Sequence, residues 1–131
     1  MRLVLLVDDL YFRVRLTDLA ERLGLEVCDP NGVPDDGRPV LAVVDLAGPS
    51  ARWAEAVKTL KARLESRVTV LGFGPHRDVG LFRAARAAGF DQVWARSKLV
   101  ADLPAFLEKL LKEASADAGI GDDPSGPDGN L

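Results

Sequence analysis

Three aspartates are the side chains of this sequence whose spacing could do chemistry. Asp8 and Asp9 follow the apolar run at residues 3–7. Asp45 follows a second apolar run, at residues 40–44. Short apolar runs of this kind are typical of buried strands in a parallel sheet, whose ligands bind at the carboxyl ends of the strands. Because three carboxylates gathered there would repel one another, we expect a hard divalent cation such as Mg²⁺ to share their oxygens.

The same three aspartates also suit a purely structural role. Aspartate is among the residues preferred at helix N-caps, and its negative charge is favourable near a helix N-terminus. Asp8 and Asp9 precede a helical pattern, and Asp45 precedes a Gly-Pro-Ser break and a further helix. An acidic ligand pocket and simple helix capping are therefore both open, and the two can coexist.

The elements that must position these side chains follow from the hydrophobic pattern. Apolar runs alternate with segments whose apolar residues recur at spacings of three and four. We expect strands at residues 3–7, 25–28, 40–44, 68–73 and 92–95, and helices at residues 11–23, 51–64, 81–88 and 103–111. This alternation predicts right-handed crossovers and one parallel sheet. Residues 29–39 (DPNGVPDDGRP) are rich in turn formers, so the second helix should be short or missing.

Composition indicates one globular domain without a general affinity for nucleic acid. The 131 residues are 47% hydrophobic and 28% charged, which is ordinary for a globular protein. The net charge of −3 disfavours direct nucleic-acid binding, which depends on clustered Lys and Arg. We expect residues 1–114 to fold as one domain. Residues 115–131, with four glycines, two prolines and four aspartates, should form a disordered acidic tail.

Several activities and locations have no support in the sequence. One cysteine, Cys28, and one histidine, His76, cannot form an internal disulfide or a structural zinc site. The first apolar run is too short for a membrane span or a signal peptide. We therefore expect a cytoplasmic protein that does not contact a membrane. A P-loop, a GxGxxG after the first strand and a GxSxG elbow are all missing, so we expect no enzymatic activity.

A glycine-rich turn follows the strand expected at residues 68–73. Its sequence, GFGPHRD, includes Gly72, Gly74, His76 and Arg77. Glycines at the end of a strand permit another group to approach the backbone closely, so this turn could bind a small ligand or a partner. His76 has no second histidine or cysteine to complete a metal site or a nucleophile pair, and an exposed loop histidine is the simpler interpretation.

The order of these motifs resembles the response-regulator receiver (CheY-like) domain over roughly residues 2–113. The resemblance rests on the Asp8-Asp9 pair, on residues 43–49 (VVDLAGP) and on the Ala88-Gly89 end of a helix. It implies a flavodoxin-like three-layer sandwich with a five-stranded parallel sheet, and a place in bacterial two-component signalling. By this resemblance the acidic pair would bind Mg²⁺, and Asp45 would accept a phosphoryl group from a histidine kinase.

The chain also departs from the receiver pattern. Counting back from Gly89 puts Gly74 where receivers carry a Ser or Thr. The same count puts Arg96 and Ser97 where receivers carry a Lys, and Lys98 lies two residues further on. The spacing from Asp9 to Gly24 is one residue short, which leaves the register of the acidic pair open by one. These departures indicate an atypical receiver or pseudo-receiver.

Three functional hypotheses follow. The first is a stand-alone receiver-like signalling domain that contacts a histidine kinase or an output protein, with Asp45 as a Mg²⁺-dependent switch. Its partner or homodimer surface would be the fourth helix, fifth strand and fifth helix, whose basic residues are Arg77, Arg83, Arg86, Arg96 and Lys98. The second is a sensor that binds a small anionic ligand through Gly72, Gly74, His76 and Arg96. The third is a constitutive adaptor whose carboxylates only cap helices.

Overall fold

Five parallel strands form a single sheet in the order β2-β1-β3-β4-β5. The computed structural model describes residues 1–47, 53–75 and 77–118. The strands are β1 (Arg2–Leu6), β2 (Glu26–Cys28), β3 (Val40–Asp45), β4 (Val68–Gly74) and β5 (Gln92–Ala95). The helices are α1 (Leu10–Arg22), α2 (Trp53–Leu64), α3 (Val79–Ala87) and α4 (Arg96–Ala118). This strand order is the flavodoxin-like one, so the predicted α/β fold class is confirmed.

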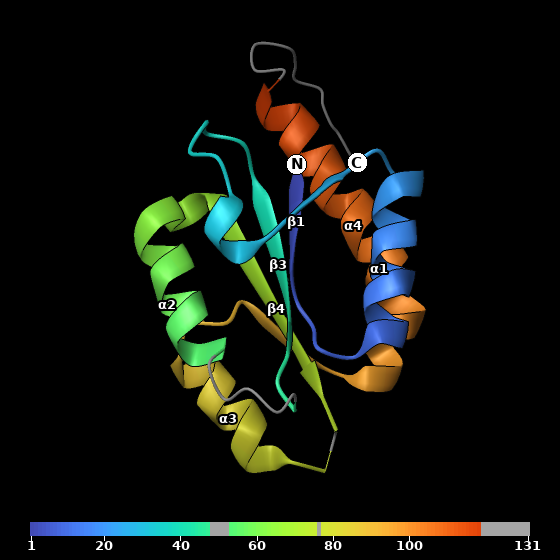
Figure 1. Ribbon diagram of the computed structural model, residues 1–131, viewed down its shortest axis with the longest axis vertical. Helices are drawn as coiled ribbons and strands as arrows, with labels where there is room; N and C mark the ends of the chain where they lie inside the picture. Colours follow the sequence, from blue (N-terminus) through green and yellow to red (C-terminus); the bar gives the residue numbers. More distant parts are fainter. Residues whose placement is uncertain (48–52, 76, 119–131) are drawn as a thin grey trace.

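The helices cover both faces of the sheet and make a three-layer sandwich. Helices α1 and α4 lie on one face, and α2 and α3 lie on the other (Figure 1). Because side chains alternate along a strand, neighbouring positions of one strand enter different cores. In β3, for example, Val43 packs toward α1 and α4, whereas Val44 packs toward α2 and α3. All six residues of β3 are buried, as expected for a central strand covered on both faces.

The second helix is missing, as the turn-rich sequence predicts. Between β2 and β3 the chain forms only a single 3₁₀ turn, Pro30–Gly32. The connection is held by Arg2, a buried residue at the start of β1. Its guanidinium donates to both carboxylate oxygens of Asp36, at 2.8 and 2.7 Å, and to Glu26 at 3.2 Å. Val33 supplies the buried apolar contact that anchors the loop to the core.

The ion pair between Arg2 and Asp36 should make the fold sensitive to acid. The hydrogen bonds from Arg2, together with the backbone N–H of Arg38, hold the pKa of Asp36 well below its ordinary value. An aspartate whose pKa is depressed in the folded state stabilises it at pH values above the pKa of the unfolded chain, about 4. This contribution is lost as the pH falls through that value toward the folded pKa. We therefore expect wild type to exceed Asp36→Asn in stability at neutral pH.

Urea unfolding at several pH values measures this effect. The stability difference between wild type and Asp36→Asn should shrink as the pH falls below about 4, because the wild-type carboxylate becomes protonated. Asp18→Asn is the matched control, since Asp18 is an exposed carboxylate on α1. A difference for Asp36→Asn that stays constant from neutral to acid pH would contradict the prediction.

The last helix differs from the expected boundaries at both ends. Helix α4 begins at Arg96, directly after β5, so Arg96, Ser97 and Lys98 form its first turn instead of ending a strand. It continues to Ala118, so the first four residues of the expected tail are helical. The remainder of that tail, residues 119–131, lies outside the described residues. Among the described helices, none is both long and apolar enough to cross a bilayer.

Candidate functional site

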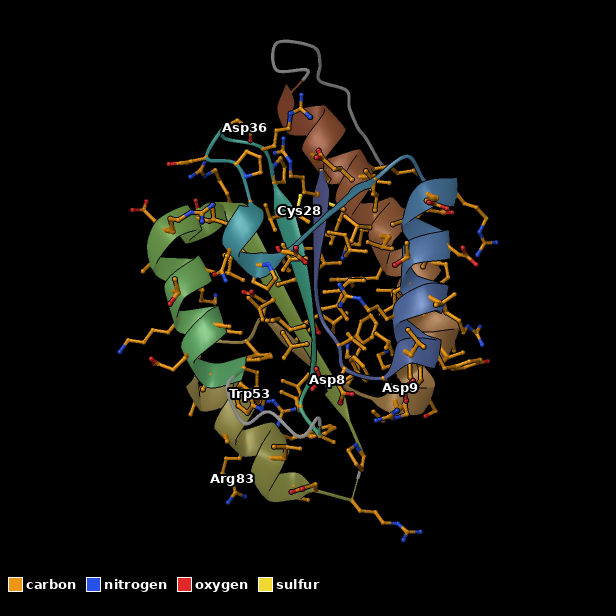
Figure 2. The ribbon with its side chains drawn as sticks, viewed as in Figure 1. Asp8, Asp9, Cys28, Asp36, Trp53 and Arg83 are labelled. Atoms are coloured by element: carbon orange, nitrogen blue, oxygen red, sulfur yellow. The ribbon has the colours of Figure 1, made fainter. Side chains whose placement is uncertain are left out.

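The structure places the three predicted aspartates at one end of the sheet but in different environments. Asp45 is the last residue of β3 and is only 7% exposed. Asp9 is the N-cap of α1, and its carboxylate accepts the backbone N–H of Phe12 at 3.2 Å. Asp8 lies between β1 and α1 with an exposed side chain. Figure 2 shows Asp8 and Asp9 at the end of the molecule that the strands β1, β3 and β4 point toward.

Asp45 combines burial with few hydrogen bonds. Its carboxylate accepts the backbone N–H of Ala47 at 3.1 Å, the geometry of a turn closed by an aspartate side chain. Burial raises the pKa of Asp45, while the Ala47 N–H and the positive charge of Arg96 act in the opposite direction. The negative charges of Asp8 and Asp9 raise this pKa further. The surroundings of Asp45 together favour its neutral form, and nearby positive charge opposes that effect.

Arg96 supplies that charge. Its Nη2 lies 3.8 Å from Oδ1 of Asp45, and its Nη1 lies 4.0 Å from Oδ2 of Asp9. Its Cζ also lies 4.9 Å from the ring centroid of Phe12 and 5.5 Å from that of Phe73, which is within the range of cation–π attraction. One guanidinium thus lies against two carboxylates and two aromatic rings.

The expected metal site is not formed by this arrangement. Within residues 1–47, 53–75 and 77–118, no three His, Cys, Asp or Glu side chains gather in a way that could hold a metal ion. Asp9 is engaged as a helix cap, and the guanidinium of Arg96 lies against both Asp9 and Asp45. The prediction that Asp8, Asp9 and Asp45 converge on Mg²⁺ is therefore not supported by their geometry.

An aromatic ring lies beside Asp45, where receivers carry a Ser or Thr hydroxyl. Strand register pairs Asp45 with Phe73, so these two side chains are neighbours on the same face of the sheet. The count from Gly89 that pointed to Gly74 is thus off by one residue. Phe73 is fully buried and packs against Phe12, with their ring centroids 5.6 Å apart. Neither Phe73 nor Gly74 carries a hydroxyl group.

Gly72 and Gly74 face apolar side chains instead of an open ligand site. A Cβ atom built on Gly72 would lie 2.7 Å from the ring of Phe90, so the glycine makes room for that ring. A Cβ on Gly74 would meet Leu46, Leu81 and Phe82 at 3.6–3.7 Å. Gly72 thus makes room for core packing, and Gly74 contacts aliphatic and aromatic side chains. These contacts do not favour a ligand at either glycine, and the ligand or partner site expected at this turn stays a prediction. His76 lies outside the described residues.

Comparison with known proteins identifies the fold. No protein-family profile matches the sequence, and no curated protein is similar to it. A CheY-like receiver domain from Methanospirillum hungatei JF-1 superposes with a TM-score of 0.66 at 16% identity, over 88% of this chain and 97% of that one. This chain has the receiver fold.

Two further solved structures share this fold. One is a response regulator from Burkholderia pseudomallei with a phosphorylated aspartic acid, with a TM-score of 0.57 at 19% identity over 94% of this chain and 76% of that one. The other is a putative CpaE2 pilus assembly protein from Sinorhizobium meliloti 1021, with a TM-score of 0.53 at 18% identity over 83% of this chain and 98% of that one. The receiver-like resemblance predicted from the sequence is confirmed at the level of fold.

The basic residues of the receiver-like domain do not form one cluster. Arg77 and the α3 residues Arg83 and Arg86 are exposed, and Figure 2 shows Arg83 directed away from the sheet. Lys98 instead pairs with Asp102 at 2.7 Å and lies 5.0 Å from the ring of Trp94. Ser97 is exposed in the first turn of α4. Arg96 and Lys98 thus form ion pairs with aspartates, whereas Arg83 and Arg86 are exposed on α3.

Sequence reasoning missed an apolar surface on α1. Leu10, Tyr11 and Val14 are 72%, 64% and 53% exposed. A signal was present, because Leu10 and Val14 are four residues apart and lie on the side of the helix opposite Phe12 and Leu16, which pack toward the core. The helix was predicted only from the apolar residues that face the core, so this second apolar face was overlooked.

Proposed function

We propose that this chain is a non-enzymatic, cytoplasmic receiver-like signalling domain that acts by binding another protein. The α1 patch, which we define as Leu10, Tyr11 and Val14, carries the proposal. It holds three of the five large apolar side chains that are exposed among the described residues. Contiguous exposed apolar side chains on a folded domain are typical of protein interaction sites. A histidine kinase or an output protein is the class of partner that the receiver fold favours.

A shallow groove between α1 and α4 lies on the Tyr11 side of this surface, away from Leu10 and Val14. Its volume is about 80 Å³, room for one apolar side chain. Tyr11 connects the α1 patch to it, because the Tyr11 hydroxyl accepts a hydrogen bond of 2.9 Å from Arg15, which lines the groove. The groove is lined by Phe12, Arg15, Leu16, Leu19, Arg22, Leu99, Val100, Leu103 and Pro104. Apolar walls with two arginines on the α1 side suit a partner segment that carries both apolar and acidic residues.

Mg²⁺-dependent phosphorylation of Asp45 is the second candidate for how the domain is controlled. It is favoured by the place of Asp45 at the end of β3, with Asp8 and Asp9 close enough to raise its pKa. It is disfavoured by the ring of Phe73 beside Asp45. Amide NMR spectra with and without beryllofluoride and Mg²⁺ distinguish control by phosphorylation from control by protein contact alone. Unchanged spectra support a domain controlled by protein contact alone, and shifts centred on Asp45 support the phosphorylation switch.

The α1 patch yields a prediction on binding. A photo-crosslinking amino acid at Tyr11 should yield one discrete adduct in cells of the source organism, and the partner can then be identified and purified. Leu10→Ser and Val14→Ser should weaken its binding about tenfold or more each, because burying one such side chain contributes about 1.5–3 kcal/mol. The thermal stability of both variants should stay close to that of wild type, since both side chains are exposed.

The basic surface on α3 provides the matched control. Arg83→Ser changes an exposed residue of α3, a helix that lies on the opposite face of the sheet from α1 and forms part of the predicted dimer or partner surface. If Arg83→Ser weakens binding and the two α1 variants do not, the partner uses the α3, β5 and α4 surface instead. If the crosslinker at Tyr11 yields no adduct, the proposal of a protein-contact domain fails.

A further inference from the structure

We infer that Arg96 is a built-in counter-ion for the acidic end of the sheet, where it replaces the divalent cation that the motif pattern predicts. The inference concerns the aspartates alone. It does not depend on whether the α1 patch binds a partner.

The buried carboxylate of Asp45 and its two acidic neighbours favour a cation at this end of the sheet. Asp45 is 7% exposed, and the two other aspartates lie close enough to act on its charge. A buried carboxylate is costly unless it is hydrogen-bonded and paired with a positive charge. The backbone N–H of Ala47 supplies the hydrogen bond, and Arg96 is the cation within ion-pair distance of Asp45 among the described residues.

Neighbouring cations are engaged elsewhere. Lys98, which lies two residues beyond the position of the receiver Lys, pairs with Asp102 one turn further along α4. Arg13 on α1 lies 4.0 Å from Asp29 and 3.5 Å from the backbone carbonyls of Leu5 and Val7. Neither residue forms an ion pair with Asp9 or Asp45, so neutralisation at the sheet edge depends on Arg96.

The position of Arg96 is set by both backbone and packing. It is the first residue of α4 and follows the last residue of β5 directly, so its Cα is held at the carboxyl edge of the sheet. Its guanidinium lies near the rings of Phe12 and Phe73, which come from α1 and β4. A planar, delocalised guanidinium can stack on aromatic rings while pairing with carboxylates, which a hydrated metal ion cannot do. The two phenylalanines thus favour arginine over Mg²⁺ at this position.

The consequence is a domain in which the buried carboxylate of Asp45 already has a positive charge beside it. In wild type, Mg²⁺ must compete with Arg96 for the carboxylates of Asp9 and Asp45. Added Mg²⁺ should therefore not stabilise the wild-type domain. Removal of the guanidinium should leave Asp8, Asp9 and Asp45 free to rearrange around an added divalent cation. The role of Arg96 is therefore to position and neutralise the carboxylates in the absence of a metal.

Thermal unfolding of Arg96→Gln with and without MgCl₂ tests the inference. NaCl of equal ionic strength controls for general screening. The melting temperature of wild type should not respond to Mg²⁺, whereas that of Arg96→Gln should be lower and should rise with added Mg²⁺. Arg83→Gln is the matched control, because it removes the same charge from an exposed position on α3. It should melt like wild type and ignore Mg²⁺.

A double variant ties the effect to Asp45. Asp45→Asn in the Arg96→Gln background should restore much of the lost melting temperature, because the unpaired buried charge is gone, and should abolish the response to Mg²⁺. If Arg96→Gln fails to fold on its own, its circular dichroism with and without MgCl₂ reports on the same coupling. The inference is overturned if wild type responds to Mg²⁺ as strongly as Arg96→Gln, if neither responds, or if Asp45→Asn leaves the loss unchanged. None of these outcomes bears on crosslinking at the α1 patch.

Discussion

Truncation of Phe73 to alanine should lower the free energy of unfolding by about 3–5 kcal/mol. Phe73 is the largest of the fully buried side chains, and it occupies the face of β4 covered by α1 and α4. Its ring packs against Phe12, and it lies beside the guanidinium of Arg96. Removing the ring creates a cavity and takes away one of the two aromatic surfaces that hold Arg96. Because small domains are stable by only about 5–15 kcal/mol, this variant should be close to unfolding.

Equilibrium urea unfolding followed by circular dichroism measures the loss. Tyr11→Ala is the control, because it also truncates an aromatic ring, but at a position that is 64% exposed. Its effect should stay below about 1 kcal/mol. If Phe73→Ala costs no more than Tyr11→Ala, the ring does not fill the space beside Asp45 as the structure has it. The description of the acidic end as closed by aromatic packing would then be wrong.

Gly72→Ala should destabilise the domain by about 1–3 kcal/mol through overpacking. The added methyl carbon would lie 2.7 Å from two ring carbons of Phe90 and 3.2 Å from Leu46. Phe90 has little freedom to move, since it is buried and its ring packs edge-on against Trp53 at 5.2 Å. The strain must therefore be relieved by a shift of the ring or of β4 itself.

Gly74→Ala separates this overpacking from a general intolerance of β4 to alanine. A methyl carbon there would meet its neighbours at 3.6–3.7 Å, which is ordinary van der Waals contact. Replacement of a glycine whose conformation alanine can adopt restricts the unfolded chain, so Gly74→Ala should be neutral or stabilising by up to about 1 kcal/mol. Phe90→Leu should relieve part of the cost of Gly72→Ala when the two are combined. Equal losses for Gly72→Ala and Gly74→Ala in urea unfolding would contradict the packing assigned to Gly72.

These two residues show how β4 serves both faces of the sheet. Phe73 faces α1 and α4 and closes the acidic end, whereas Gly72 faces α2 and α3 and admits the ring of Phe90. Core packing thus accounts for the glycine at position 72. The chemistry of the site lies on the other face, with Asp45 and Arg96.

The sequence by itself determined the fold class and the placement of the aspartates at strand ends. Runs such as residues 40–44 and the helical period of residues 11–23 are local signals, because each depends on the repeat of one strand or one helix. They predicted five strands and a short or missing second helix, and the structure confirms both. Of the two roles left open for Asp9, the structure shows the helix cap. The expected end of the last helix was wrong because its weakly apolar final turns carry little periodic signal.

Only the tertiary structure decided what surrounds Asp45. Which side chain lies beside it depends on the register between β3 and β4, and a count along the chain that is off by one residue selects the opposite face. The contact of Arg96 with Asp9, Asp45 and two phenylalanines joins α1, β3, β4 and α4, which are distant in sequence. A charge pairing across four elements has no periodic pattern in the sequence, because it arises only when the folded chain brings those elements to one edge of the sheet.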